Sequence, residues 1–470
     1  MIKCSSFMIM TNVSNIVISL SNKYKNMKLI KIVQYLFYLL IFALPWQTRL
    51  IYQTGELNGG FWEYGTKALY GTEILLAVIF ILIISQIVIS IKGQKIEWQL
   101  RPLDYFILGF IIFILLSTFW SIDCSQTLYY FSLLIEGLAL FYLASRLGLK
   151  FRLLSYSFVF SGLLQSILAI QQFLTQMIYG NKWLGMASQN VTDLGVSTIE
   201  GAGRFMRAYG SLSHPNMLGG WLVVCIIFLL GLLFQYQKRF YHAPWKVSKA
   251  LIGQAIFLFS SLVIMTYGLV LSFSRSAWIG LIVAMIFIWI GLFKQKKKDL
   301  LKFYLRLNLI ILLVIVLFSM VYGQLLINRV SVESRLEVQS IDQRLQGYGQ
   351  AFSIFKAHSL VGVGLGNYTA ALYEVDNTRP AWEYQPVHNL DLLTMAELGI
   401  IGELILIGIF ISILLIIFKQ WRVRAEENRV ILLSAALAIV VMAIFDHYLW
   451  SLYFGILLFW LILGLSIREE

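Results

Sequence analysis

The sequence carries little charge for its length. Only 13% of its 470 residues are Asp, Glu, Lys or Arg, whereas 59% are apolar. A soluble protein of this size needs considerably more charge to cover its surface. The three cysteines are scattered without ligand spacing, so the sequence indicates neither a disulfide framework nor a zinc site. These shortages exclude a soluble protein and leave a polytopic membrane protein as the class.

Motifs for nucleotides and metals are also missing. The glycine run Gly362–Gly366 follows no strand of a βαβ unit, so it does not indicate a nucleotide-binding loop. Glu374 and Asp376 form an acidic pair that no other acidic cluster accompanies. We therefore expect neither a metal nor an organic cofactor.

Long apolar segments dominate what the sequence does contain. A transmembrane helix needs about 20 mainly apolar residues. Twelve segments meet this requirement, at roughly 30–47, 71–91, 103–121, 127–147, 153–175, 216–236, 251–272, 276–293, 303–324, 393–418, 428–446 and 448–467. We therefore predict an all-α integral membrane protein with about twelve transmembrane helices.

The net charge of +13 gives the orientation of these helices. The basic residues form short clusters between the apolar segments, a pattern typical of a topology signal rather than of a nucleic-acid surface. Every cluster falls on the side of the two termini, which the positive-inside rule assigns to the cytoplasm. Both termini are therefore predicted to be cytoplasmic, and nucleic acid is not an expected partner.

This topology divides the chain into two regions. Residues 1–29 are expected to form a poorly ordered cytoplasmic extension, and residues 30–470 form the polytopic membrane domain. Two long loops, 176–215 and 325–392, fall on the outer side. A polar connection as long as the second is uncommon without a function. It joins the ninth and tenth predicted spans.

The second outer loop contains a helical pattern. Leu345, Tyr348, Phe352 and Phe355 recur at the spacing of one helix face. This spacing predicts an amphipathic helix that lies near the membrane surface. The loop is therefore expected to be partly helical.

Three residues that are far apart in the sequence all fall on the outer boundary of the predicted bilayer: Arg207, Arg275 and His388. An arginine inside a membrane costs about 2.5–3.5 kcal/mol at the centre and less at the edge, so it usually faces a partner or a polar cavity. Two arginines can clamp a pyrophosphate, and an imidazole can take a proton from a sugar hydroxyl. We expect the three side chains to line one cavity and to transfer a glycan from a polyprenyl-pyrophosphate lipid.

Each of these residues also has a plainer interpretation. Arg275 could be an interfacial anchor whose side chain reaches the lipid headgroups. Arg207 could be an ordinary loop residue, and His388 an ordinary loop or capping residue. The sequence alone leaves these alternatives open.

Four further residues are candidates for a supporting role. His214 precedes a proline and Asn216, and is expected to shape the turn that begins the sixth span. Asn389 follows His388 directly. His447 lies at the outer edge between the last two spans and is the rival base.

Two other functional classes remain as alternatives. A transporter or flippase for lipid-linked sugars would need charged or broken helices along a path through the membrane. The predicted spans carry little charge at their centres, with Glu136 and Glu403 as exceptions, and show no pair of broken helices. This class is therefore the more remote alternative. A non-catalytic scaffold in polysaccharide assembly is the other.

The sequence resembles the bacterial O-antigen ligase and polymerase family. Four stretches carry the resemblance: RAYGSLSHPN (Arg207–Asn216), SFSRSAWIG (Ser272–Gly280), the run from Arg344 to Tyr368 with its GVGLGNY, and HNLDLLTMAELGIIG (His388–Gly402). They occur in the order of the family. The first 150 residues match it only as apolar helices.

The resemblance implies a metal-independent membrane glycosyltransferase of the GT-C type in the bacterial cytoplasmic membrane. Its donor would be a glycan on undecaprenyl pyrophosphate, and its acceptor another glycan or lipid. By motif, His388 would be the catalytic base, with Arg207 and Arg275 as pyrophosphate ligands on the outer face. Arg344 matches a basic position of the family with a role in donor binding or in fixing the loop. The leading hypothesis is an O-antigen ligase-like reaction, and the alternative is a polymerase that extends the lipid-linked glycan.

Overall fold

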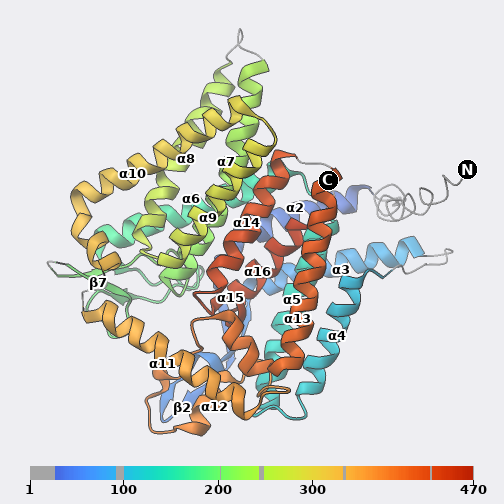
Figure 1. The fold of residues 1–470 in the computed structure, drawn as a ribbon, viewed down its shortest axis with the longest axis vertical. Helices are drawn as coiled ribbons and strands as arrows, with labels where there is room; N and C mark the ends of the chain where they lie inside the picture. The colour runs from blue at the N-terminus through green and yellow to red at the C-terminus, as the bar shows by residue number, and fades with distance from the viewer. Residues whose placement is uncertain are drawn as a thin grey trace, which may run out of the picture.

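The computed structural model describes residues 27–91, 100–201, 203–242, 248–331, 335–423 and 426–468. The predicted extension 1–29 lies outside this part except for its last three residues, which begin a helix. Every predicted span contains a helix (Figure 1). These helices are α2 (Met27–Ala43), α3 (Gly71–Ile91), α4 (Pro102–Ser117), α5 (Cys124–Arg146), α6 (Phe151–Thr175), α7 (Pro215–His242), α8 (Lys249–Leu271), α9 (Arg275–Lys294), α10 (Lys298–Ser331), α13 (Leu390–Val423), α14 (Glu427–Ala443) and the consecutive α15 (Tyr448–Ser451) and α16 (Tyr453–Ser466).

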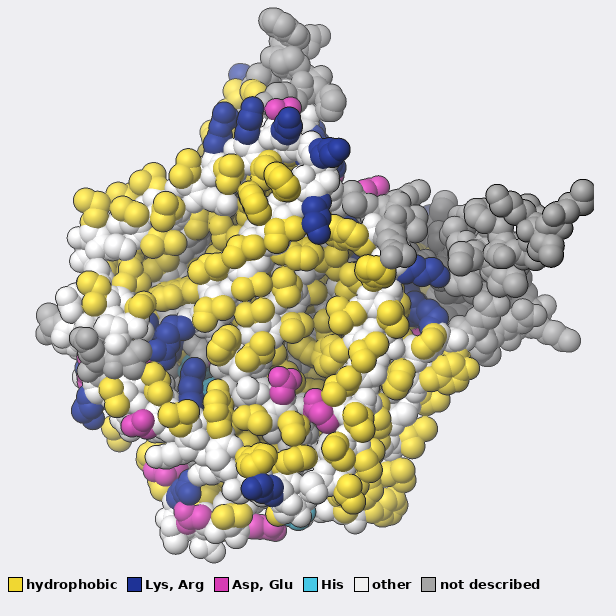
Figure 2. Space-filling view, viewed as in Figure 1, with side chains coloured by type: hydrophobic (Ala, Val, Ile, Leu, Met, Phe, Trp, Pro, Cys, Tyr) yellow, Lys and Arg dark blue, Asp and Glu magenta, His cyan; other side chains and the backbone are white. Residues whose placement is uncertain are grey.

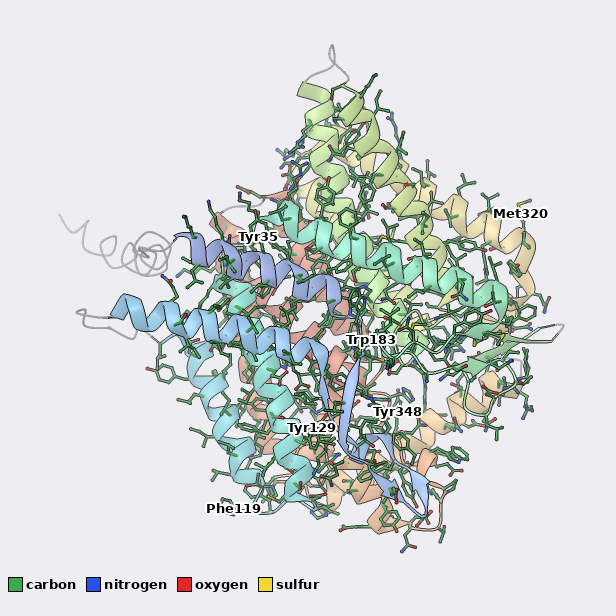
Figure 3. All side chains as sticks on the ribbon, turned by 180° about the vertical axis from the view of Figure 1, so that it is seen from behind. Tyr35, Phe119, Tyr129, Trp183, Met320 and Tyr348 are labelled. Carbon is green, nitrogen blue, oxygen red and sulfur yellow. The ribbon has the colours of Figure 1, made fainter. Side chains whose placement is uncertain are left out.

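Seven of the described helices are long and apolar enough to cross a membrane: α5 to α10 and α13. Shorter apolar helices include α4, α16 and most of α3. Exposed apolar side chains such as Tyr35, Phe119 and Met320 lie on the outer surface (Figure 3), as expected for a protein surrounded by lipid. The chain is thus a helical multi-pass membrane protein, while the number twelve and the GT-C type of fold stay predictions.

Helix α7 is the centre of the fold. Its most apolar stretch of 18 residues is entirely buried, as expected of a helix that is apolar on all sides. It packs against α6, α8, α9 and α14. Gly219 lets α9 approach closely, because a Cβ there would lie 2.7 Å from the Cβ of Ser274. The first turn of α7 is thereby held close to the turn between α8 and α9.

One end of the bundle is tied together by basic residues. Lys238 at the end of α7 and Lys297 before α10 both pair with Glu427 at the start of α14. Arg468 after α16 donates to the carbonyl of Leu149, between α5 and α6. Figure 2 shows Lys and Arg side chains gathered at the upper end of the molecule and apolar ones across its middle. This arrangement is consistent with the predicted sidedness, which stays a prediction.

The described chain also contains short strands, which the sequence analysis did not predict. Four two-stranded antiparallel sheets pair β1 (Arg49–Gln53) with β4 (Lys67–Tyr70), β2 (Glu56–Leu57) with β3 (Gly60–Phe61), β5 (Met177–Ile178) with β6 (Gln189–Asn190), and β7 (Thr198–Glu200) with β8 (Arg204–Met206). Strands of two to five residues are too short to show an alternating pattern. One signal was present, because Asn58 and Gly59 both have positive φ in the β2–β3 turn, as Asn-Gly hairpins do.

The second outer loop begins with helix. Helix α10 is broken at Tyr322, where φ is −120° and ψ is 26°, and its last part runs on to Ser331, past the predicted end of the span near 325. The loop then contains α11 (Arg335–Ala357), α12 (Tyr368–Val375) and the 3-10 helix η2 (Ala381–Glu383). The helix predicted from the apolar spacing is therefore confirmed. Leu345 and Phe352 are 60% and 49% exposed. A location of this face at the membrane surface stays a prediction.

Helix α13 breaks at Gly399, where φ is +64° and ψ is −171°, a conformation that is essentially restricted to glycine. Beyond the break, Ile400 N donates to Ser359 O at 2.8 Å, and Gly364 N donates to Glu397 O at 2.9 Å. The glycine run after α11 is thus docked on the break in α13. Its glycines permit a close backbone approach, since a Cβ at Gly362 would lie 2.3 Å from Glu397 O.

Replacing Gly399 with alanine should therefore destabilise the fold. A Cβ at this position would lie 2.5 Å from the backbone of Leu360 and Val361, in a backbone conformation that alanine avoids. We expect a loss of at least about 2 kcal/mol, measured as a lower thermal midpoint in detergent. Gly349→Ala is the matched control, because a Cβ at this position in α11 meets open space. Equal midpoints for Gly399→Ala and the wild type would contradict this account of the break.

Candidate functional site

A buried carboxylate, Asp446, connects three segments at the end of the bundle where α7 and α13 begin. Asp446 follows α14 and its side chain is 3% exposed. One oxygen lies 3.3 Å from Nδ1 of His388 and accepts from the backbone N–H of His447 at 2.9 Å. The other oxygen accepts from Nδ2 of Asn216 at 2.6 Å. Asp446 thus holds the loop before α13 against the first turn of α7.

The charge on Asp446 determines the tautomer of His388. Burial alone would raise the pKa of Asp446, but the hydrogen bond with His388 and the neighbouring histidines hold it well below its usual range. An ionised carboxylate only accepts hydrogen bonds, so Nδ1 of His388 is the donor. The lone pair of His388 is then on Nε2. This arrangement prepares the imidazole to act as a base.

The start of α13 positions His388. Asn389 is the residue that caps this helix, since its Oδ1 accepts from Leu392 N at 2.9 Å. His388 stands directly before the cap and its side chain is 28% exposed. Asn389 therefore fixes the backbone next to His388. The capping role that the sequence left open for His388 belongs to Asn389.

The other two candidate histidines belong to the same network, with His447 buried and His214 partly buried. The N–H of Asn216 donates to Nδ1 of His214 at 3.1 Å, which shapes the first turn of α7 as the sequence predicts. His447 packs its ring 4.9 Å from that of His388, and its Nδ1 lies 2.6 Å from Oγ of Ser451. Burial lowers the pKa of both His214 and His447 to about 3. His447 is thus a weaker base than a histidine with an ordinary pKa.

Arg207 is buried behind Asp446. Its Nη2 donates to Oδ1 of Asn216 at 2.6 Å, and its Nε donates to the carbonyl of Ser272 at 2.9 Å. Burial and the charge of Arg329 lower the pKa of Arg207, which means that its surroundings favour a nearby anion. Its observed contacts support Asn216 and, through it, Asp446.

The turn between α8 and α9 orients two further arginines. Phe273 is buried there with a left-handed φ of +47°, and its carbonyl accepts from Nε of Arg329 at 2.9 Å. Arg275 follows two residues later, and its Nη2 lies 3.2 Å from Oε2 of Glu337. Nη1 of Arg329 pairs with the other oxygen of Glu337. Arg329 and Glu337 were not among the predicted site residues, because both fall in the predicted outer loop 325–392.

Arg344 completes this group. It lies on α11 and makes no hydrogen bond or ion pair within the described part of the chain. It acts electrostatically on Arg275, Arg329 and His447, which indicates that it lies near all three. We call Arg275, Arg329 and Arg344, with Glu337, the arginine cluster.

A cavity of about 420 Å³ opens beside Asp446. His388, Asp446 and His447 line it, and so do Arg49 and Glu63. Arg207 and the arginine cluster are not among its lining residues. The expectation that Arg207, Arg275 and His388 line one cavity is therefore wrong for the two arginines.

His388, Asp446 and His447 are also the described residues that could hold a metal ion, since their ligand atoms lie within 4.8 Å of one another. Hydrogen bonds already engage some of their atoms: Asp446 accepts from Asn216 and His447, and Nδ1 of His447 is hydrogen-bonded to Ser451. The absence of a metal requirement stays a prediction.

Residues 260–407 match a family model described as O-Antigen ligase. Over this stretch the chain is similar to the O-antigen ligase family. The match contains the arginine cluster and His388, whereas Arg207 and Asp446 lie outside it. A search of curated proteins finds no match to the chain. The O-antigen ligase family comprises membrane glycosyltransferases of polysaccharide biosynthesis, and its substrates are lipid-linked glycans.

These two histidines should make the fold sensitive to mild acid. The unfolded chain binds a proton at His214 below about pH 6.5, whereas the folded chain does so only near pH 3. Each such group therefore removes about 1.4 kcal/mol of stability per pH unit as the pH falls between these values. His214→Asn keeps an acceptor for the first turn of α7 and should flatten the dependence of the thermal midpoint on pH between 6.5 and 4.

His358→Asn changes an exposed histidine outside the network and is the matched control. Its curve should follow that of the wild type. A His214→Asn curve as steep as the wild-type curve would contradict the assignment of a buried neutral His214.

Proposed function

We propose that the chain transfers a glycan from undecaprenyl pyrophosphate to an acceptor hydroxyl on the outer face of the bacterial cytoplasmic membrane. One observation carries the proposal: the buried carboxylate of Asp446 is hydrogen-bonded to Nδ1 of His388, and His388 lines a cavity beside it. The arginine cluster lies near this pair, because Arg344 acts electrostatically on His447, whose ring packs against that of His388. A base and an anion site close to one another suit transfer from a pyrophosphate donor, because the sugar carbon under attack is bonded to the phosphate oxygen.

In the proposed reaction, Nε2 of His388 takes the proton of the acceptor hydroxyl. The acceptor oxygen then attacks the anomeric carbon of the donor sugar. The bond from that carbon to the phosphate oxygen breaks, and its electron pair leaves with undecaprenyl pyrophosphate. Asp446 stabilises the imidazolium that forms, because the carboxylate lies at its Nδ1–H. The products are the new glycosidic bond and the free carrier.

The arginine cluster fits the leaving group in charge. Three arginines and one glutamate leave two positive charges, and a pyrophosphate diester carries two negative ones. Glu337 holds Arg275 and Arg329 side by side in the absence of the donor. Arg344, which makes no ion pair among the described residues, is free to turn towards a phosphate. Donors of this kind stabilise the negative charge that develops on a departing group.

Arg207 has a different place in this proposal. Its Nε and Nη2 are used by Ser272 and Asn216, so it supports Asp446 from behind. A direct contact with pyrophosphate through its Nη1 remains part of the proposal.

The same site also suits a polymerase, which would extend the lipid-linked glycan itself. The geometry of His388 and the arginine cluster is common to both reactions, because they differ only in the acceptor. Product analysis distinguishes them. A polymerase lengthens the glycan on undecaprenyl pyrophosphate, whereas a ligase moves it to a new carrier.

Removing the base should abolish transfer while the donor still binds. We expect His388→Gln to lower the transfer rate at least about 100-fold, the usual contribution of a general base. Purified protein in nanodiscs would be given lipid-linked glycan extracted from the membranes of its source bacterium. His358→Gln is the matched control. Full activity of folded His388→Gln would disprove this mechanism.

Arg344→Gln should weaken the donor site specifically. The loss of one charge-assisted contact should raise the half-saturating donor concentration about tenfold, equivalent to about 1.4 kcal/mol. Arg335→Gln on the same helix is the matched control, since Arg335 is exposed and pairs with Glu200 at 3.6 Å. An unchanged donor dependence in Arg344→Gln would remove this arginine from the proposed site.

A further inference from the structure

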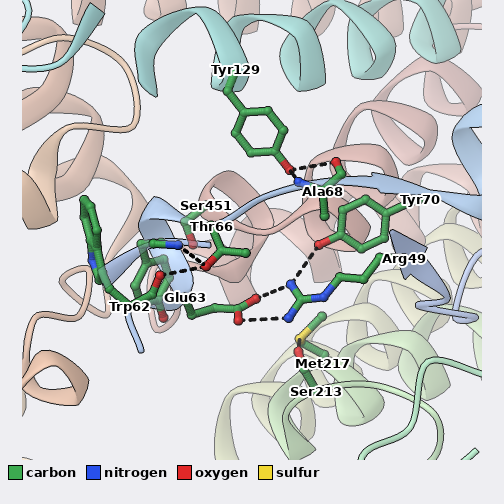
Figure 4. A network of polar contacts seen from close by, with 12 residues as sticks. Arg49, Trp62, Glu63, Thr66, Ala68, Tyr70, Tyr129, Ser213, Met217 and Ser451 are labelled. Atoms are coloured by element: carbon green, nitrogen blue, oxygen red, sulfur yellow. Dashed lines mark hydrogen bonds and ion pairs between the residues drawn. The ribbon is translucent and has the colours of Figure 1, made fainter. Parts of the chain in front are cut away.

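The cavity beside His388 has a second polar wall that the proposed mechanism does not use. Arg49 at the start of β1 faces Glu63 in the 3-10 helix η1 (Glu63–Gly65), and both line the cavity. Nη1 of Arg49 lies 2.5 Å from one carboxylate oxygen of Glu63 and Nη2 lies 3.0 Å from the other (Figure 4). The segment from β1 to β4 therefore brings a bidentate ion pair to the site from outside the matched family region.

This pair is fixed in position by its surroundings. Arg49 and Tyr70 are directly opposite in the β1–β4 pair, and the ring of Tyr70 stacks on that of Tyr453 at 4.2 Å. Tyr64, next to Glu63, packs edge-on against His447 with ring centroids 5.8 Å apart. The ring of His447 in turn lies 4.9 Å from that of His388. The ion pair is thus held a few side chains away from the proposed base.

The pair is accessible to a ligand. The side chain of Arg49 is 26% exposed and that of Glu63 is 39% exposed. Gln385, from the loop before α13, is exposed and lines the same cavity. A volume of about 420 Å³ falls within the range of small-molecule sites, roughly 300–1,000 Å³. The cavity therefore has room for the sugar end of an acceptor.

The chemistry of the walls selects an uncharged sugar. Arg49 and Glu63 neutralise each other, so neither is left to bind an ionic group. Their remaining donor and acceptor positions, with the amide of Gln385, suit neighbouring hydroxyls. An anionic group would instead favour the arginine cluster.

We propose that Arg49, Glu63 and Gln385 bind the non-reacting hydroxyls of an uncharged acceptor sugar and thereby determine acceptor specificity. This inference rests on the proposed function, because the hydroxyl that His388 deprotonates must lie in the space that His388 faces. The donor pyrophosphate occupies the arginine cluster, and the acceptor occupies the cavity. The sequence match covers Gln385 but neither Arg49 nor Glu63, so two of the three proposed acceptor ligands lie outside the matched region.

The test measures transfer at saturating donor while the acceptor concentration is varied. The acceptor is the glycolipid fraction extracted from membranes of the source bacterium, and the protein is the full chain in nanodiscs. Glu63→Gln and Gln385→Ala should each raise the half-saturating acceptor concentration about tenfold. The maximal rate and the half-saturating donor concentration should stay within twofold of wild type, because the base and the arginine cluster are intact.

Asp376→Asn is the matched control, because Asp376 forms an ion pair of similar exposure with Arg379 that does not line the cavity. An unchanged acceptor dependence in both variants would overturn the inference, as would a loss confined to the maximal rate. Gln385→Ala covers the case in which Glu63→Gln fails to fold, since the Gln385 side chain bonds only to the carbonyl of Trp382 among the described residues. If His388→Gln keeps full activity, the proposed function fails instead, whatever these variants do.

Discussion

The site depends on one buried carboxylate with three donors. Asp446 accepts hydrogen bonds from His388, Asn216 and the backbone of His447, and these come from the loop before α13, the first turn of α7 and the turn after α14. A buried carboxylate without such partners would cost several kcal/mol. The ends of three helices are therefore constrained together, and the same interaction orients the imidazole whose Nε2 is proposed to act as the base.

Two polar regions of different charge lie near Asp446. Three arginines and Glu337 form a net positive cluster around the turn between α8 and α9. The cavity is lined by the Arg49–Glu63 ion pair, amides and tyrosines, with His388 and Asp446. A transferase for a pyrophosphate donor and a sugar acceptor needs two such regions next to each other, because the leaving group and the nucleophile differ in charge but act on the same carbon.

Much of the fold was predictable because hydropathy is a local property. Each predicted span contains a helix, and the sequence marked His388 and Arg275 by their position at helix ends. Contacts between distant residues were not predictable: Asp446 is 58 positions from His388 and 230 from Asn216. Arg329 and Glu337 were missed because α10 continues past its apolar stretch. Arg49 and Glu63 were missed because a short strand and a three-residue 3-10 helix leave no detectable period.

The most direct test of this account is a double-mutant cycle on the pair at its centre. Transfer rates would be measured for His388→Gln, Asp446→Asn and the double variant, each checked for folding by its thermal midpoint. Because Asp446 is proposed to act through His388, the double variant should be no slower than His388→Gln alone. Losses that multiply in the double variant would show that Asp446 acts independently of His388, which would contradict the account.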